Sequence, residues 1–255
     1  MGVIRERNAS IELLIIDRQQ AANAIDLDTS EALARALDEL SEDVEVRAFV
    51  VSGSGDRVFS AGMDLKAVQA GLAPAINGVS GGFAGLTRRE FPHPLIAAVN
   101  GAAVGGGFEI VLACDLVVAA ENAHFALPEV TRGLMAASGG LVRLAKRLPP
   151  ALALEFSLTG GRIEARRALE LGLVNRLVPE GRALAEATEL AQQIASNAPL
   201  AVRASKRLLR FALEHADHDA WQLNEALSQE VLASEDAREG AAAFSDKRAP
   251  RFMGG

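Results

Sequence analysis

Short apolar runs separated by turn-forming residues recur along the first two-thirds of the chain. A run of this kind, bounded by glycine, proline, asparagine or aspartate, is typical of a β-strand. Six segments fit the description, at 11–17, 47–52, 95–99, 116–119, 124–127 and 173–178. The first of them, IELLIID, is apolar enough to be a buried strand.

Between these runs, leucines recur at the spacing of an amphipathic helix. Leu33, Leu37 and Leu40 share one face of such a helix, and Asp28 or Thr29 is expected to cap its N-terminus. The same reasoning predicts further helices at 108–114, from near 138, at 151–158 and at 163–171. Gly172 is expected to end the last of these.

The last third of the chain carries no strand pattern. From residue 182 onward it is almost entirely helical, with breaks expected at 197–199, 217–219 and Gly240. Strands that alternate with helices, followed by helices alone, indicate an α/β body with a helical C-terminal part. Residues 71–85 are glycine-rich, so we expect a mobile loop or irregular helix near the functional site, and a short helix before Pro92.

The stretch 95–115, LIAAVNGAAVGGGFEIVLACD, combines a strand, a glycine triplet at 105–107 and a helix that contains Glu109. Glycines at a helix N-terminus let backbone N–H groups approach a ligand, and the helix dipole favours negative charge there. A carboxylate is costly to bury without a partner. The stretch predicts an oxyanion-stabilising corner with an acid or base beside it; the alternative is a tight turn with Glu109 facing water. A second corner of similar build is VFSAGMDL at 58–65.

Composition narrows the classes of function. Of the 255 residues 49% are hydrophobic, which excludes a disordered chain, and the net charge of −7 argues against nucleic acid as the main partner. A single cysteine, Cys114, excludes an internal disulfide and a cysteine-built metal site. No targeting segment or membrane span is visible, so we expect a soluble cytoplasmic protein that binds no membrane.

Common catalytic motifs are absent. The chain has no GxGxxG after a strand, no GxxxxGK and no HExxH, and its four histidines lack the spacing of a metal site, so no metal is expected. The segment AASGG at 136–140 approaches the nucleophile elbow GxSxG but lacks its first glycine and a preceding strand. We therefore expect Ser138 to be a helix N-cap rather than a nucleophile.

Two carboxylates remain, Glu109 and Glu129, and both lie beside apolar segments rather than in charged runs. Two carboxylates that share a partly dry site can hold a water molecule between them and take different protonation states. Such a pair suits general acid–base chemistry at neighbouring atoms. Two N–H groups from separate loops would polarise a carbonyl and stabilise an enolate.

Four segments together resemble the crotonase superfamily of enoyl-CoA hydratases and isomerases: VNGAAVGGGFEIVLACD, VFSAGMDL, HFALPEVTRGL and EGAAAFSDKRAPRF. The resemblance runs from near Asn23 to the C-terminus. It implies an α/β fold, a crotonase-like ββα spiral core with the acyl-CoA site over 1–195, and a C-terminal helical trimerisation region over 196–255. It also implies a homotrimer, or a hexamer built as a dimer of trimers.

The resemblance assigns roles at the two corners. The residue after the glycine of the AGxD loop and the middle glycine of the triplet would donate the oxyanion N–H groups; these are Met63 and Gly106. Hydratases of the family carry two glutamates, here Glu109 and Glu129, and keeping both favours hydration or dehydration over isomerisation. Glu109 would activate the water that attacks Cβ, and Glu129 would handle the proton at Cα. No separate cofactor is implied, because coenzyme A is part of the substrate.

The same resemblance suggests where coenzyme A binds. Local cations must receive its phosphates, because the chain as a whole is acidic. Lys247 and Phe244, near the C-terminus, would reach the nucleotide from a neighbouring subunit. The other expected contacts are Arg18, Ala22, Ala61, Gly62, Asp64, Leu65 and Lys66.

Three positions depart from the family pattern. Met63 stands where short-chain hydratases often have alanine, which would reshape the acyl pocket. The segment GLMAASGG replaces the GTIPGAGG of many members, so the loop that lines the acyl group differs. Arg18-Gln19 replaces the usual RP, which would alter the turn that binds coenzyme A.

Alternative functions stay open at this point. The segments PEV, GGLVRL and VNRLV are similar to those of carnitinyl-CoA dehydratases, and an enoyl-CoA Δ3–Δ2 isomerase is a further alternative. A non-catalytic acyl-CoA-binding protein is the alternative of another class. A binder has no need of two carboxylates in its site, so Glu109 and Glu129 argue for an enzyme.

Overall fold

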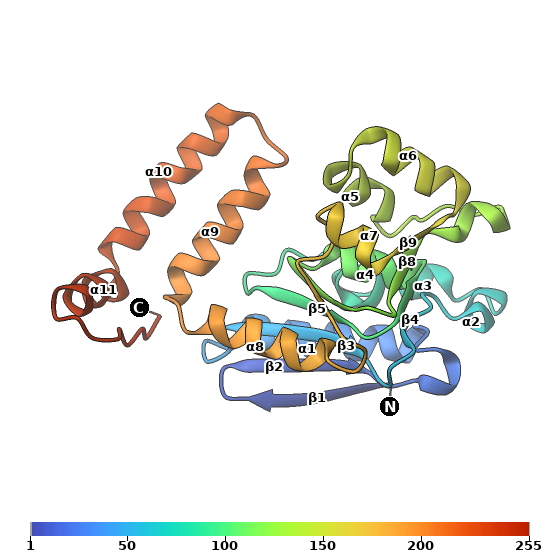
Figure 1. The fold of residues 1–255 in the computed structure, drawn as a ribbon, viewed down its shortest axis with the longest axis horizontal. Helices are drawn as coiled ribbons and strands as arrows, with labels where there is room; N and C mark the ends of the chain where they lie inside the picture. The colour runs from blue at the N-terminus through green and yellow to red at the C-terminus, as the bar shows by residue number, and fades with distance from the viewer. Residues whose placement is uncertain (1, 255) are drawn as a thin grey trace.

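A computed structural model describes residues 2–254 and shows an α/β body from which a helical arm extends (Figure 1). The larger sheet has the strand order β1-β2-β3-β5-β7-β10 and is parallel except for β1. The smaller has the order β4-β6-β8-β9 and is parallel except for β9. The strands are β1 Val3–Asn8, β2 Ile11–Ile16, β3 Ala48–Gly53, β4 Val58–Ser60, β5 Leu95–Val99, β6 Ala102–Val104, β7 Leu116–Ala120, β8 His124–Ala126, β9 Arg162–Glu164 and β10 Arg176–Val178.

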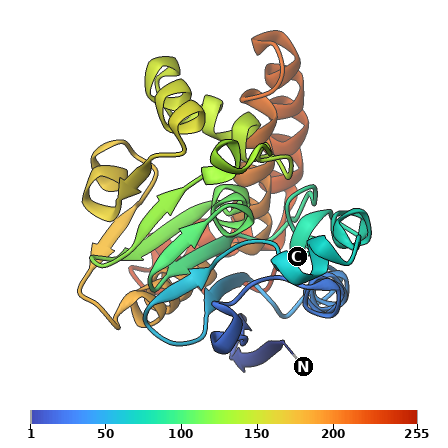
Figure 2. The same ribbon diagram turned by 90° about the vertical axis from the view of Figure 1, so that its right-hand side faces the viewer.

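The helices surround the strands, as Figure 2 shows from the side. Those of the body are α1 Leu27–Ser41, α2 Leu65–Gln69, α3 Ala73–Gly78, α4 Gly106–Ala113, α5 Gly140–Arg147, α6 Pro150–Thr159, α7 Ala165–Glu170 and α8 Ala183–Ala195. Three short 3₁₀ segments are η1 Gln19–Ala21, η2 Phe83–Gly85 and η3 Pro128–Arg132. The arm consists of α9 Pro199–Ala212, α10 Asp217–Ala233 and α11 Glu235–Ser245.

The larger sheet is buried on both faces. Along β2, Ile11 and Leu13 pack with the apolar face of α8, whereas Leu14 and Ile16 join the main core with α1 and α4. Strands β3 and β5 divide their side chains between the same two clusters. This double cover explains why the strands read as continuous apolar runs rather than as alternating patterns.

A repeated unit builds the body and places the site. Each of β3, β5 and β7 lies in the larger sheet and is followed by β4, β6 or β8 in the smaller sheet. Each unit moves one strand along both sheets, which is the ββα spiral that the sequence resemblance implied. Because β4 and β6 are parallel neighbours, the loops that leave them emerge side by side.

The six expected strands are all present, but the sequence pattern missed β1, whose side chains are mostly exposed, and the three-residue strands β4, β6 and β9. The cap of α1 is also different from our expectation. Asp26, not Asp28 or Thr29, precedes the helix, and its carboxylate accepts a hydrogen bond of 2.9 Å from the Thr29 N–H. Aspartate two residues earlier fits the same capping chemistry.

Other boundaries also shifted. Ile163 lies in β9, and the expected helix begins only at Ala165. The region before Pro92 has the 3₁₀ segment η2 instead of a helix, and 71–85 contains the ordered helix α3. Gly240 lies inside α11, and the break falls at Ser234, whose side chain caps α11. An interior glycine costs a helix only about 1 kcal/mol, which the rest of α11 tolerates. No helix of residues 2–254 has both the length and the apolar character that a bilayer crossing needs.

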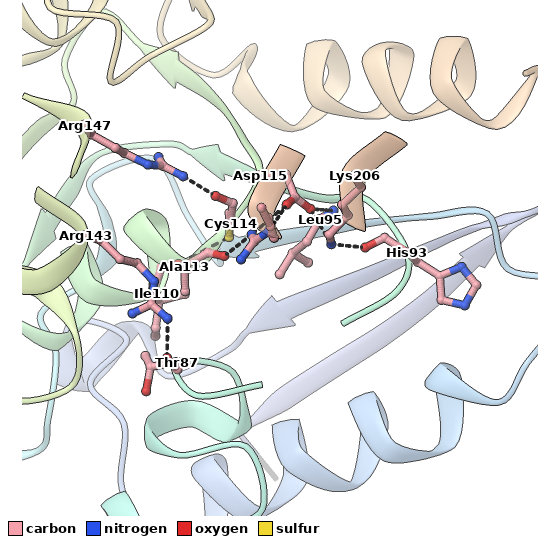
Figure 3. A network of polar contacts seen from close by, with 11 residues as sticks. Thr87, His93, Leu95, Ile110, Ala113, Cys114, Asp115, Arg143, Arg147 and Lys206 are labelled. Atoms are coloured by element: carbon pink, nitrogen blue, oxygen red, sulfur yellow. Dashed lines mark hydrogen bonds and ion pairs between the residues drawn. The ribbon is translucent and has the colours of Figure 1, made fainter. Parts of the chain in front are cut away.

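One contact that holds the arm to the body centres on Asp115, two residues after the end of α4, the helix that carries Glu109 (Figure 3). Its carboxylate accepts from the Leu95 N–H at 2.8 Å and pairs with Lys206 at 2.7 Å and Arg210 at 2.6 Å, both on α9. Lys206 also donates to the His93 carbonyl at 2.6 Å. Burial lowers the pKa of Lys206, and the Asp115 charge opposes that shift.

We expect Asp115→Ala to destabilise the protein by about 3 kcal/mol, because it leaves the Lys206 ammonium desolvated without its carboxylate. The matched control is Glu214→Ala, which breaks an exposed ion pair with Lys146 and should cost less than about 1 kcal/mol. Urea unfolding followed by circular dichroism measures both. Equal losses in the two variants would show that Asp115 is not what holds α9.

Candidate active site

The glycine triplet has a packing reason at each position. Gly105 has φ +57°, and a Cβ there would lie 3.1 Å from the Glu129 Oε1. A Cβ on Gly106 would lie 2.7 Å from the Phe83 ring, and one on Gly107 would lie 2.1 Å from the Ser60 carbonyl oxygen. Side chains at these positions would push α4 away from the groups that surround its N-terminus.

The two glycine corners that the sequence singled out are in contact. Gly62 has φ +86°, and a Cβ there would lie 2.7 Å from the backbone nitrogen of Gly106. The Gly62 loop is fixed on its other side, where the Ile25 N–H donates to the Gly62 carbonyl at 2.8 Å. Within residues 2–254, neither the Met63 N–H nor the Gly106 N–H donates to a protein group. Two backbone donors are thus left unpaired at one junction.

Glu109 lies in the first turn of α4 and is only 3% exposed. Its Oε1 accepts two backbone hydrogen bonds, from the Ser138 N–H at 2.7 Å and the Gly140 N–H at 2.8 Å. Burial raises the pKa of Glu109, the two N–H groups and Arg143 act against that shift, and the charge of Glu129 adds to it. The carboxyl is therefore a buried group that gains a proton more readily than an exposed glutamate.

Glu129 comes from a different element, η3, and is half-buried. Burial raises its pKa as well, against an opposing contribution from Arg132. Its Oε2 is buried without a hydrogen-bond partner among the described residues. A buried oxygen without a partner is costly, so this carboxyl is suited to hold a proton or to bind a ligand atom or a water molecule.

The fold thus brings together the four residues to which the resemblance gave catalytic roles. Glu129 lies against Gly105, next to Gly106, and its charge acts on Glu109. Met63 follows the glycine that contacts Gly106. Two carboxyls with raised pKa values and two free N–H donors, on separate elements, can together exchange protons beside a polarised carbonyl.

Ser138 is neither a helix cap nor an activated nucleophile. Gly139, with φ +98°, is the residue that precedes α5, and Ser138 stands one position earlier. The Ser138 hydroxyl donates to the Asn77 Oδ1 at 3.0 Å rather than to a base. The expectation of an N-cap was wrong because the glycine pair at 139–140 makes the turn into α5.

The residues expected around coenzyme A fall into two groups in the body. Ala61, Leu65 and Lys66 are exposed at the rim of the Gly62 loop, and Ala22 is partly exposed beside it. The Ala22 carbonyl accepts a hydrogen bond from the Ala61 N–H at 3.0 Å. Lys66 has no ion-pair partner among the described residues and remains open to a phosphate.

Arg18 and Asp64 are occupied with each other. Arg18 pairs with Asp26 at 2.8 Å and Asp64 at 3.1 Å, and it also donates to the Ala24 carbonyl. The other Asp64 oxygen accepts from the Lys66 N–H at 2.9 Å and starts α2. Arg18 therefore braces the loop that carries the oxyanion corner, and its contact with coenzyme A stays a prediction.

Phe244 and Lys247 lie far from these residues within one chain. They are in or just after α11, at the end of the arm opposite to α2 and α3 (Figure 1). Phe244 is 87% exposed. One chain cannot bring them to Lys66, so their expected role requires the neighbouring subunit that the prediction invoked.

Sequence reasoning missed three residues that shape the site. Phe83 packs its ring against Gly106, Gly140 holds Glu109, and Asn77 holds Ser138. Phe83 and Asn77 belong to the glycine-rich stretch 71–85, where weak periodicity gave no way to place side chains. The glycine pair 139–140 was visible, but only the fold shows that its N–H group faces Glu109. Among the described residues, no cluster of histidine, cysteine or carboxylate side chains could hold a metal ion.

Known proteins match the chain over its whole length. The sequence model of the enoyl-CoA hydratase/isomerase family matches residues 6–255. The chain belongs to this family. The crotonase resemblance and the fold that it implied are therefore confirmed.

Relatives named for carnitinyl-CoA and relatives named for enoyl-CoA are similar to this chain at comparable sequence identity. A carnitinyl-CoA dehydratase of Salmonella typhi is 46% identical over 253 residues, 97% of each chain. The structure of an enoyl-CoA hydratase from Mycobacterium tuberculosis H37Rv is 42% identical, with a TM-score of 0.94 over 100% of this chain and 99% of that one. A carnitinyl-CoA hydratase from Mycobacterium avium is also 42% identical, with a TM-score of 0.79 over 99% and 98%.

We expect Glu109→Gln to stabilise the protein at pH 7 and not at pH 4. The raised pKa means that the folded state binds the proton more tightly than the unfolded state, so stability falls as pH rises above about 4.5, the ordinary glutamate value. The amide of this variant carries no charge to desolvate. Urea midpoints at both pH values measure this, and a gain that persists at pH 4 would contradict a charge effect.

Proposed function

We propose that the chain is a hydro-lyase that adds water to the Cα=Cβ bond of a 2-enoyl-CoA thioester, or removes it in the reverse direction. One observation carries the proposal: two unpaired N–H donors, of Met63 and Gly106, adjoin two buried carboxyls on separate elements. An isomerase of this family needs only one carboxyl to move a proton between carbon atoms. Hydration needs one group at the attacking water and another at Cα.

The geometry supports a division of labour between the glutamates. Met63 and Gly106 would donate to the thioester oxygen, and the negative charge that develops there would face the N-terminus of α4. Glu109, fixed through Oε1, would take a proton from water as its oxygen bonds to Cβ. Glu129, whose Oε2 has no protein partner among residues 2–254, would supply the proton to Cα. The water thus adds as OH at Cβ and H at Cα.

Carnitinyl-CoA dehydration is the second candidate, because a relative at 46% identity is named carnitinyl-CoA dehydratase. It is the same chemistry on an acyl group with a cationic substituent, so the catalytic residues do not distinguish the two. The ratio of kcat/KM for crotonyl-CoA and crotonobetainyl-CoA, both measured in the direction of hydration, does. A difference of more than about tenfold would correspond to at least about 1.4 kcal/mol of transition-state discrimination and would name the better substrate.

We predict that Glu109→Gln and Glu129→Gln each lower kcat for crotonyl-CoA hydration by about 10²–10⁴-fold, because an amide cannot exchange the required proton. The double variant should lose far less than the product of the single losses. Loss of the enoyl-thioester absorbance gives the rate. Each variant should keep its fold and bind a saturated acyl-CoA, because glutamine preserves the size of the side chain.

The matched control is Glu121→Gln, an exposed glutamate after β7, which should leave kcat unchanged. Hydration at near wild-type rate in Glu109→Gln would remove that residue from water activation. Isomerase activity retained in the same variant would instead favour the Δ3–Δ2 isomerase. Acyl-CoA binding by the wild-type chain with no turnover of any enoyl-CoA would indicate a non-catalytic binder.

We also propose that the chain forms a homotrimer, or a hexamer of two trimers, in which the arm of one subunit reaches the coenzyme A of the next. The arm exposes large apolar side chains that one chain leaves uncovered among the described residues: Leu209, Leu213, Trp221, Leu232 and Phe244. A set of this kind is typical of an interface.

If Lys247 meets a phosphate of coenzyme A, Lys247→Ala should raise KM at least several-fold, leave kcat unchanged and weaken the salt dependence of binding. Arg251→Ala, a cation nearby in the same tail, is the control and should change KM less. If the wild-type chain sediments as a monomer at micromolar concentration, the proposed assembly is wrong. If KM is unchanged in Lys247→Ala, the proposed contact with coenzyme A is wrong.

A further inference from the structure

Ser138 donates two hydrogen bonds, to residues on two different helices. Its backbone N–H donates to the Glu109 Oε1 at 2.7 Å, and its hydroxyl donates to the Asn77 Oδ1 at 3.0 Å. Ser138 is 8% exposed; its bond to Glu109 is buried, and its bond to the partly exposed Asn77 is partly buried. Ser138 therefore connects the carboxylate on α4 with the side chain of Asn77 on α3. Asn77 and Ser138 are 61 positions apart in the chain.

Each of the two segments that meet at this contact buries one other residue, Ile76 on α3 and Ala136 in the loop. Residues 133–139 form neither helix nor strand, and this loop ends in Gly139 with φ +98°. Helix α3 has six residues and buries only Ile76, whose carbonyl accepts from the Ser30 hydroxyl at 3.2 Å. A loop without regular structure relies on side-chain contacts to keep its N–H groups in place.

The direction of the Ser138 N–H matters because both protein hydrogen bonds to Glu109 reach the same oxygen. Ser138 and Gly140 donate to Oε1, whereas no donor among residues 2–254 lies within hydrogen-bond distance of Oε2. Oε1 therefore acts as the anchor and leaves Oε2 for an incoming group. A shift of the loop at Ser138 would loosen this anchor.

We propose that Asn77 and Ser138 are positioning residues for Glu109: the side-chain hydrogen bond between them fixes the 133–139 loop, so that its N–H group holds the carboxylate with one oxygen free for water. The inference deepens the proposed hydro-lyase function and rests on it for the role of Glu109. Neither side chain takes part in proton transfer. Their effect passes through the position and the ionisation of Glu109.

Several groups act on the Glu109 carboxyl, and the pair must be separated from them. Glu129 on η3 raises its pKa and Arg143 on α5 lowers it, while the Ser138 and Gly140 N–H groups favour the charged form. Loss of the anchor at Ser138 would therefore make Glu109 easier to protonate. A role limited to holding the fold would not change its titration in this direction.

The experiment titrates Glu109 in protein labelled with ¹³C at the glutamate carboxyls, and Glu109→Gln identifies its signal. Ser138→Ala and Asn77→Ala should each raise the apparent pKa of Glu109 by about half a unit or more, and the double variant should show no larger shift than either. Ser41→Ala, the control, removes a hydroxyl that donates to the Asp38 carbonyl within α1, away from α3 and the 133–139 loop, and should leave the pKa unchanged.

The kinetics of crotonyl-CoA hydration give a second readout. Each variant of the pair should lower kcat about three- to tenfold, move the acid limb of the kcat profile to higher pH, and leave KM within about twofold, in line with the loss of one hydrogen bond. Ser138→Thr keeps the hydroxyl and should restore both readouts. Thermal unfolding verifies that each variant is folded.

The outcomes separate this inference from the proposed function. An unchanged Glu109 titration in folded Ser138→Ala, or an equal shift in Ser41→Ala, overturns the positioning role. A wild-type chain that hydrates no enoyl-CoA overturns the proposed function, while the titration still decides whether the pair controls Glu109.

Discussion

The burial of Glu109 inside α4 is the constraint on which the rest of the site depends. A carboxylate in an otherwise apolar helix requires compensation, and the chain supplies it with two backbone N–H groups rather than with a cation in direct contact. A cation at that place would hold the carboxylate permanently charged. Two neutral donors offset only part of the effect of burial, so the pKa of Glu109 stays raised, which suits a group that exchanges protons.

The compensation dictates the backbone around it. Donors can reach Glu109 only if α5 starts beside α4, and a Cβ at Gly140 would lie 2.8 Å from the Glu109 Cγ. In the same first turn of α4, Gly107 lies against the Ser60 carbonyl and Gly106 against Phe83. The glycines therefore set how closely the spiral units pack, and the unpaired N–H groups of the site are a consequence of that packing.

Much of this could be predicted from the sequence, and the limits have physical causes. Strands buried on both faces leave a strong local signal, and the glycine triplet predicted the start of the helix in which Glu109 is buried. Ser138 was misjudged because a cap and a loop residue one position earlier have the same local pattern. Asn77 was out of reach, since its partner is 61 residues away and its own helix has only one buried residue. The apolar surroundings of Glu129 suggested a partner for Glu109, but their relative position could not be predicted, because only the fold brings η3 to α4.

Asp115 connects the region of the site to the arm through its ion pairs with Lys206 and Arg210 on α9. Helix α4 has its N-terminus at the oxyanion corner, and its C-terminal carbonyls accept from guanidinium groups, that of Ala113 from Arg210 and that of Cys114 from Arg147 (Figure 3). Cations at this end oppose the negative pole of the helix dipole. Arg210 belongs to α9 and also pairs with Asp115, so the helix that carries Glu109 is fixed at one end by the oxyanion loops and at the other by the arm. If the arm is ordered against a neighbouring subunit, as proposed above, that contact would also fix α4 and with it the position of Glu109.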